Sequence, residues 1–149
     1  PTRVSFAAGA NYAAEANDTL LAFAMIETAE GMANLDAIAA TPGLDGLYVG
    51  PADLTLSLTG GRLPPGFDRE EPEMIEALQR IVAACNANGI RAALHCGTPD
   101  YAARAIGWGF DLTTVGGDSR FLAAAAGASV SRFRELAGEA VAARREGGY

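Results

Sequence analysis

The stretch Gly46-Leu47-Tyr48-Val49-Gly50-Pro51-Ala52-Asp53-Leu54 decides how this chain is interpreted. Its first four residues form an apolar run of the length of a buried strand, and the Gly-Pro pair behind them ends that run. Asp53 therefore comes just after a strand, where a carboxylate can reach a ligand. A second apolar run, residues 20–26, ends in the same way at the carboxylate of Glu27.

Strand-like and helix-like segments alternate along the chain. The apolar runs predict strands at residues 20–26, 46–49, 90–96 and 110–115, and helical spacing predicts helices at residues 31–38, 72–88 and 99–108 and after Asp118. Strands this apolar leave no face for water, so the alternation predicts an α/β fold with a parallel sheet covered by helices. An open doubly wound sheet and a (β/α)8 barrel both satisfy this pattern. Because only four βα units are present, we interpret residues 1–149 as part of one barrel domain.

Composition excludes several kinds of partner. The 149 residues carry 18 acidic and 11 basic side chains, a net charge of −7, which repels nucleic acid and anionic membranes. No apolar run approaches the length of a membrane span and the first residues do not have the layout of a signal peptide, so a cytoplasmic protein is expected. Cys85 and Cys96 stand in no metal or disulfide motif and are expected to be reduced thiols.

Glu27 and Asp53 are candidates for a shared metal site. Successive parallel strands lie about 4.8 Å apart and end at the same edge, so the two carboxylates would emerge side by side. Oxygen ligands without a His or Cys cluster favour Mg²⁺ or Mn²⁺. The backbone amides of Ala52 and Asp53 could hold a substrate carboxylate beside the cation, and a 2-oxo acid would fit. The alternative is that Asp53 only caps its turn and Glu27 only pairs with a surface arginine.

Several ordered motifs resemble the HpcH/HpaI aldolase/citrate lyase family, and within it the class II pyruvate aldolases that act on 4-hydroxy-2-oxoheptanedioate. The resemblance covers nearly the whole chain. The motifs are Asn17-Asp18, Met25-Ile26-Glu27-Thr28, Asn34-Leu35-Asp36, residues 42–54, Trp108-Gly109-Phe110-Asp111 and Val115-Gly116-Gly117-Asp118.

The resemblance implies a metal-dependent carbon–carbon lyase on a (β/α)8 barrel, of which this chain holds roughly the C-terminal half. It places the metal ligands on Glu27 and Asp53 and the pyruvate carboxylate on the amides of Ala52 and Asp53. Met25 stands where the family has a pyruvate-binding glutamine, and a thioether cannot donate that hydrogen bond. The family's catalytic histidine and arginine lie on earlier strands, so no catalytic residue is assigned here. The resemblance also implies a homo-oligomer, a hexamer in the family, acting on pyruvate and an aldehyde.

Two further residue groups are interpreted less directly. His95, the only histidine, ends the third predicted strand, where the resemblance implies a contact with the aldehyde half of the substrate. Residues 59–71 lack any period and could be a lid whose Arg62 and Arg69 contact substrate. Two other functions remain open: a catalytically silent half-barrel that binds divalent metal, and a citramalyl- or malyl-CoA lyase-like enzyme.

Overall fold

The elements follow the predicted alternation. The structure, a computed structural model, describes residue 9 and residues 11–146. Its elements are α2 (Tyr12–Thr19), β1 (Phe23–Ile26), α3 (Ala29–Ala33), α4 (Leu35–Ala39), β2 (Gly46–Val49), α5 (Pro51–Thr59), α6 (Pro72–Asn88), β3 (Arg91–Leu94), α7 (Pro99–Gly107), β4 (Leu112–Thr113) and α8 (Asp118–Glu146).

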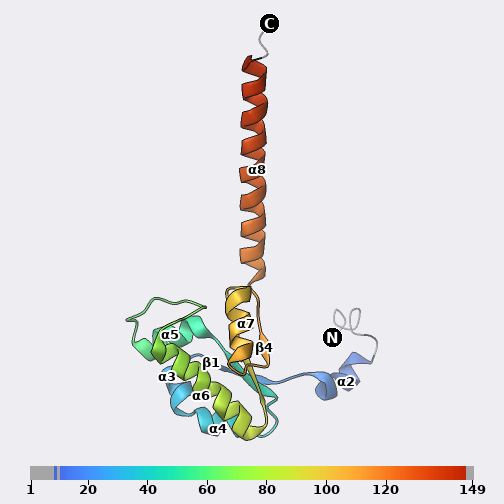
Figure 1. Cartoon of the computed structure of the whole chain (residues 1–149). Coiled ribbons are helices and arrows are strands. Elements are labelled where there is room, and N and C mark those ends of the chain that lie inside the picture. The colour runs from blue at the N-terminus through green and yellow to red at the C-terminus, as the bar shows by residue number, and fades with distance from the viewer. Residues whose placement is uncertain (1–8, 10, 147–149) are drawn as a thin grey trace.

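The four strands form one parallel sheet in the order β1-β2-β3-β4. Each strand therefore pairs with the next one along the chain, without the reversal of order that marks the switch point of a doubly wound sheet. The helices between the strands pack against one face, as Figure 1 shows for α4 and α6. This is the arrangement of consecutive βα units in a (β/α)8 barrel.

Side chains alternate across the sheet and create two unlike faces. Ile26, Leu47, Val49 and Leu94 are buried under the helices, where α6 contributes an apolar face that includes Ile81. Alternation sends their neighbours to the opposite side of each strand. That opposite face is open.

Three expectations differ from the structure. Residues 51–59 form helix α5, whereas the sequence predicted no helix between the strand at residues 46–49 and the helix at residues 72–88. Gly50 at its N-cap, Pro51 in its first turn and Gly60 in a left-handed conformation at its end are typical helix boundary residues. Helix α2 was not expected. The first, third and last strands are shorter than predicted, with two residues in β4. Residues 60–71 contain no helix or strand, as predicted.

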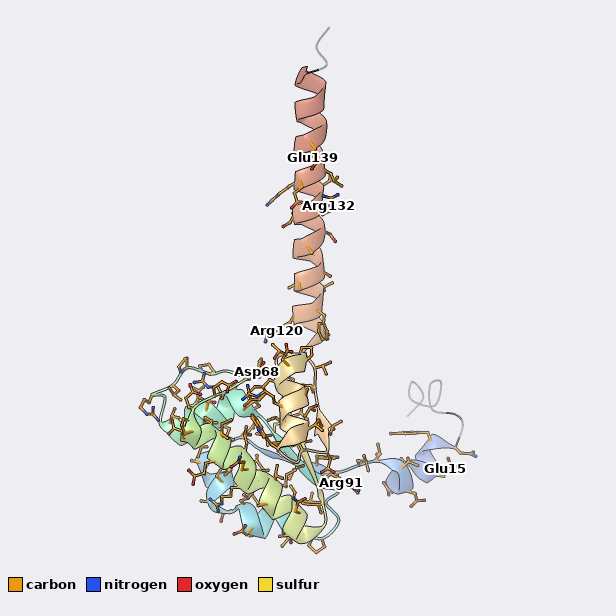
Figure 2. All side chains as sticks on the ribbon, viewed as in Figure 1. Glu15, Asp68, Arg91, Arg120, Arg132 and Glu139 are labelled. Carbon is orange, nitrogen blue, oxygen red and sulfur yellow. The ribbon has the colours of Figure 1, made fainter. Side chains whose placement is uncertain are left out.

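Helix α8 runs away from the sheet as a single 29-residue element (Figure 1). Its described side chains project into solvent along most of its length (Figure 2), and Leu122 and Phe133 are 72% and 70% exposed. Among the helices of the described residues, none has the length and apolar character needed to cross a membrane.

The two cysteines fit the reduced state that was predicted. Both thiols are free and buried in the core. Burial raises the pKa of the Cys96 thiol to about 11, so it stays protonated at neutral pH. Neither thiol is therefore a candidate nucleophile.

Candidate functional site

Three strands end at the same level of the sheet. The last residues of β1, β2 and β3 pair with one another across the sheet. The residues that follow them, Glu27, Gly50 and His95, therefore lie side by side along the carboxyl edge. They also belong to the open face, because each comes one position after a residue buried under the helices. The sequence placed Glu27 and His95 at strand ends, and the register brings them to one edge.

The Glu27 carboxylate lies directly against the Gly50 turn. A methyl group added at Gly50 would lie 3.0 Å from Oε2 of Glu27 and 3.2 Å from its Cβ. The same methyl group would be 3.6 Å from Sδ of Met25, which is 57% exposed on this face. The structure thus brings Met25, Glu27 and the Gly50 turn together, and glycine at position 50 provides the space for Glu27.

The Gly50 turn is the start of helix α5. Leu54 N donates to Gly50 O at 3.0 Å, which makes Pro51, Ala52 and Asp53 the first helical turn. Proline has no N–H, and the amides of Ala52 and Asp53 precede the first donor of the helical ladder. Both amides are therefore available to an anion at this end of α5, with the helix dipole favouring negative charge there.

A hydrogen bond between the start of α3 and helix α5 fixes the relative position of the two segments that follow β1 and β2. The backbone N–H of Ala29, two residues after Glu27, donates to Oγ of Ser57 in α5 at 2.8 Å. Thr28 caps α3 by accepting from Gly31 N at 2.9 Å. The backbone that follows Glu27 is therefore tied both to α3 and to α5, the helix whose first turn contains Asp53.

His95 is held between two aromatic side chains. Its Nδ1 lies 2.9 Å from the Tyr48 hydroxyl, and the Phe67 ring centroid lies 4.8 Å from its own. All three side chains are half-buried. Burial is the main cause that raises the pKa of the Tyr48 hydroxyl above its usual value, so this group stays protonated at neutral pH.

Phe67 belongs to a cover segment, residues 67–71, that crosses the end of β3. Asp68 in this segment accepts from Gly97 N at 2.7 Å and from the Thr98 hydroxyl at 2.7 Å. Arg120, at the start of α8, also lies next to Gly97 (Figure 2). A methyl group added at Gly97 would be 2.9 Å from Nη1 of Arg120 and 3.3 Å from Oδ2 of Asp68. No sequence pattern indicated these contacts, because they join residues that are far apart in the chain.

The two arginines predicted to contact substrate from this loop are engaged elsewhere. Arg62 pairs with Glu73 at the start of α6. Arg69 pairs with Glu71 at 2.5 Å, and its side chain is 14% exposed. Both guanidinium groups therefore brace the loop, and the expectation that they reach substrate carboxylates is not supported.

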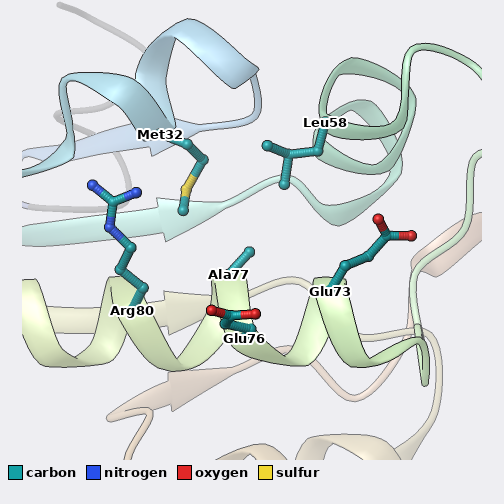
Figure 3. A pocket seen from close by; sticks show the side chains of 6 residues that line it. All are labelled: Met32, Leu58, Glu73, Glu76, Ala77 and Arg80. Atoms are coloured by element: carbon teal, nitrogen blue, oxygen red, sulfur yellow. The ribbon is translucent and has the colours of Figure 1, made fainter.

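A hollow of about 230 Å³ lies outside this edge, between α3, α5 and α6. Figure 3 shows Met32 and Leu58 above it and Glu73, Glu76, Ala77 and Arg80 of α6 below. None of these residues belongs to the strand ends. The hollow is a gap in the helical layer, separate from the candidate site.

Glu27 and Asp53 are the candidate metal ligands. Among the described residues, neither carboxylate takes part in an ion pair. Within that part of the chain, Glu27 therefore has no arginine partner. No group of three or more His, Cys, Asp or Glu side chains converges anywhere in that part of the chain. Two carboxylates alone would leave most positions of an octahedral ion to water and substrate, as Mg²⁺ sites commonly do.

Comparison with known proteins identifies the family. The model of the HpcH/HpaI aldolase/citrate lyase family matches residues 3–125. The chain belongs to this family. Its relatives include a hydroxypyruvate/pyruvate aldolase of Rhizorhabdus wittichii, 37% identical over 136 residues that make up 91% of this chain and 53% of that protein. A 5-keto-4-deoxy-D-glucarate aldolase of Shigella dysenteriae is 34% identical over 113 residues, 76% of this chain and 42% of that protein.

A solved HpcH/HpaI aldolase/citrate lyase family protein from Burkholderia cenocepacia has the same fold. It superposes with a TM-score of 0.70 at 32% identity, over 87% of this chain and 49% of the other. Macrophomate synthase superposes with a TM-score of 0.67 at 26% identity. The sequence-based prediction of the family and of a partial TIM-barrel fold is thus confirmed. The chain spans about half the length of the curated HpcH/HpaI relatives it matches.

Proposed function

We propose that this chain provides the metal- and pyruvate-binding side of a class II aldolase active site. The observation that carries the proposal is the edge formed by Glu27 and the start of α5. Glu27 follows β1 and lies against the Gly50 turn, and Asp53 belongs to the first turn of α5, which follows the adjacent strand β2. Among the described residues neither carboxylate takes part in an ion pair. The HpcH/HpaI family membership of the chain supports aldol chemistry at this edge.

Each residue has a separate task in this proposal. Glu27 and Asp53 would hold Mg²⁺ or Mn²⁺ through carboxylate oxygens, the ligands these ions prefer. When bound, the ion supplies Lewis-acid polarisation of a 2-oxo acid and stabilisation of enolate charge. The amides of Ala52 and Asp53 bind the substrate carboxylate and orient it at the positive end of α5.

Met25 and the proton-transferring group determine which part of the reaction is proposed for this chain. Met25 lies beside Glu27 and offers an apolar contact to the substrate, with no hydrogen-bond donor. The proton-transferring group is not among the residues assigned here. Turnover of a 4-hydroxy-2-oxo acid to pyruvate and an aldehyde is therefore proposed for the intact protein, as is its assembly into a homo-oligomer.

The relatives' names favour aldol chemistry over CoA ester cleavage. Those at 34% and 37% identity are named aldolases of hydroxypyruvate, pyruvate and a keto-deoxy sugar acid. In the described part of the chain, no observation points to an adenosine-binding surface. We therefore rank the CoA lyase alternative below the aldolase.

Exchange of the pyruvate methyl protons with solvent deuterium tests the proposal. The intact protein with Mn²⁺ should catalyse this exchange, and Glu27→Gln and Asp53→Asn should each lower it by about 100-fold or more because a lost ligand weakens the ion's site. Glu30→Gln, a carboxamide substitution on the exposed face of α3, is the matched control and should exchange as the wild type does. Metal binding without exchange would instead support the silent half-barrel.

A further inference from the structure

We propose that Tyr48 is a positioning residue for His95, and that the pair presents one fixed hydrogen-bond donor, His95 Nε2–H, to the aldehyde half of the substrate. The inference rests on the proposed aldolase function. It concerns the part of the same edge that lies away from the metal ligands, and it assigns that part a preference for aldehydes that carry a further oxygen.

The sheet register brings Tyr48 and His95 together. Tyr48 pairs with Ala93 across β2 and β3, and His95 follows two positions later on the same face. The two side chains are diagonal neighbours on the open face, a separation that an aromatic side chain can bridge. Their 2.9 Å hydrogen bond follows from this placement.

The chemistry of the pair decides which imidazole nitrogen carries the proton. In the described part of the chain, the Tyr48 hydroxyl has no other hydrogen-bond acceptor, and a phenol is a better donor and a poorer acceptor than an imidazole nitrogen. The Tyr48 O–H therefore donates to Nδ1 of the neutral ring. The ring proton then resides on Nε2, in the way that a partner on one nitrogen fixes the tautomer of a metal-bound histidine.

The second nitrogen remains open to a ligand. Among the described residues, every buried side-chain nitrogen or oxygen has a hydrogen-bond partner. His95 Nε2 has no partner in that part of the chain. This atom is therefore not buried and has access to solvent. Phe67 packs against the ring, tilted by 52° with the centroids 4.8 Å apart, and restricts its motion. Nε2–H therefore stands as an oriented donor at the carboxyl edge of β3.

Distance and chemistry identify the group that this donor meets. His95 lies two strands from Glu27, or about 10 Å at the usual strand spacing. A pyruvate unit anchored near Glu27 would thus place the second substrate towards His95. A fixed N–H at that point recognises a hydroxyl or carboxylate oxygen beyond the aldehyde carbon, which an unsubstituted alkyl aldehyde cannot supply.

Tyr48→Phe tests the inference because it removes the hydroxyl and keeps the ring. With pyruvate saturating, kcat/KM for a hydroxylated aldehyde such as glyceraldehyde should fall about 3- to 10-fold, the range for loss of one neutral hydrogen bond. The value for propanal should stay within about 2-fold. Tyr12→Phe, which removes the same atom from α2, is the control and should change neither value.

A spectroscopic measurement separates this inference from the proposed function. In intact protein labelled with ¹⁵N-histidine, the His95 signals, assigned by their loss in His95→Gln, should show Nδ1 as an acceptor and Nε2 protonated. In Tyr48→Phe they should move towards an average of the two tautomers. Unchanged ¹⁵N signals, or an equal loss of kcat/KM for both aldehydes, would overturn the role of Tyr48. Absence of pyruvate exchange in the wild type would overturn the aldolase proposal, and the ¹⁵N signals would still report on the pair.

Discussion

Substitution of Gly50 by alanine should weaken metal binding while leaving the fold intact. Gly50 has φ −95°, a value that alanine also adopts, so the substitution places no strain on the backbone. The added methyl group would instead lie 3.0 Å from Oε2 and 3.2 Å from Cβ of Glu27. The effect of this substitution is therefore directed at the one carboxylate that the turn supports.

The size of the effect follows from these distances. Non-bonded carbon contacts are optimal at about 3.5–4.0 Å, so the Glu27 side chain must move by a few tenths of an ångström. Metal–oxygen distances tolerate only about 0.2 Å, and disturbing a residue that supports a ligand costs about 10- to 100-fold in affinity. We expect Mn²⁺ affinity to fall by about 10-fold. The free energy of unfolding should change by less than about 1 kcal/mol, because the entropic gain of Gly→Ala offsets the poorer N-cap.

Calorimetric titration with Mn²⁺ and thermal unfolding of the same samples check both numbers. Gly107→Ala is the matched control, because a methyl group there has no atom within 4 Å. Its Mn²⁺ affinity should equal that of the wild type. If Gly50→Ala binds Mn²⁺ as tightly as the wild type while Glu27→Gln does not, Glu27 is not held by this turn and the reasoning fails.

Two other perturbations test the edges of the sheet. Asp68→Ala leaves the N–H of Gly97 without its acceptor, so hydrogen exchange at that amide should accelerate and the free energy of unfolding should fall by about 1–2 kcal/mol; unchanged exchange would show that the cover segment is not held there. The pKa of Asp111 is lowered by the hydrogen bond from Ala92 N, with a further contribution from Arg91. This carboxylate therefore stabilises the fold at pH values above its pKa in the unfolded chain. The stabilisation is lost as the pH falls through its pKa in the folded chain. Asp111→Asn should therefore be less stable than the wild type at pH 7 by about 1 kcal/mol, and the difference measured by urea denaturation should disappear in acid; a constant difference from pH 7 to pH 2 would contradict this account.

The sequence predicted where Glu27, Asp53 and His95 lie relative to the strands better than it predicted the elements that carry them. Glu27 and Asp53 were placed at the ends of adjacent parallel strands from local apolar runs alone, and the register places both strand ends at one edge. The segment that holds Asp53 was misread as a loop, because its Gly-Pro start resembles a turn. Pro51 in the first turn and Gly60 at the end were the available signals for helix α5.

The surroundings of His95 could not be predicted from the sequence. Tyr48 and Phe67 lie 47 and 28 positions away in the chain, and their contacts depend on the strand register and on the path of an irregular loop. Local periodicity carries no information about either. The same limit applies to Asp68, whose contacts at Gly97 depend on how that loop folds back over β3.

The strictly sequential strand order has a consequence for how this edge assembles during folding. Glu27, the Gly50 turn and His95 are each delivered by a different βα unit. The contact of Gly50 with Glu27 and that of Tyr48 with His95 both join residues far apart in the chain. Contacts of this kind form only after long stretches of chain have closed, which is slow compared with helix formation. The complete edge is therefore formed late, when β3 pairs with β2, and no single βα unit carries it alone.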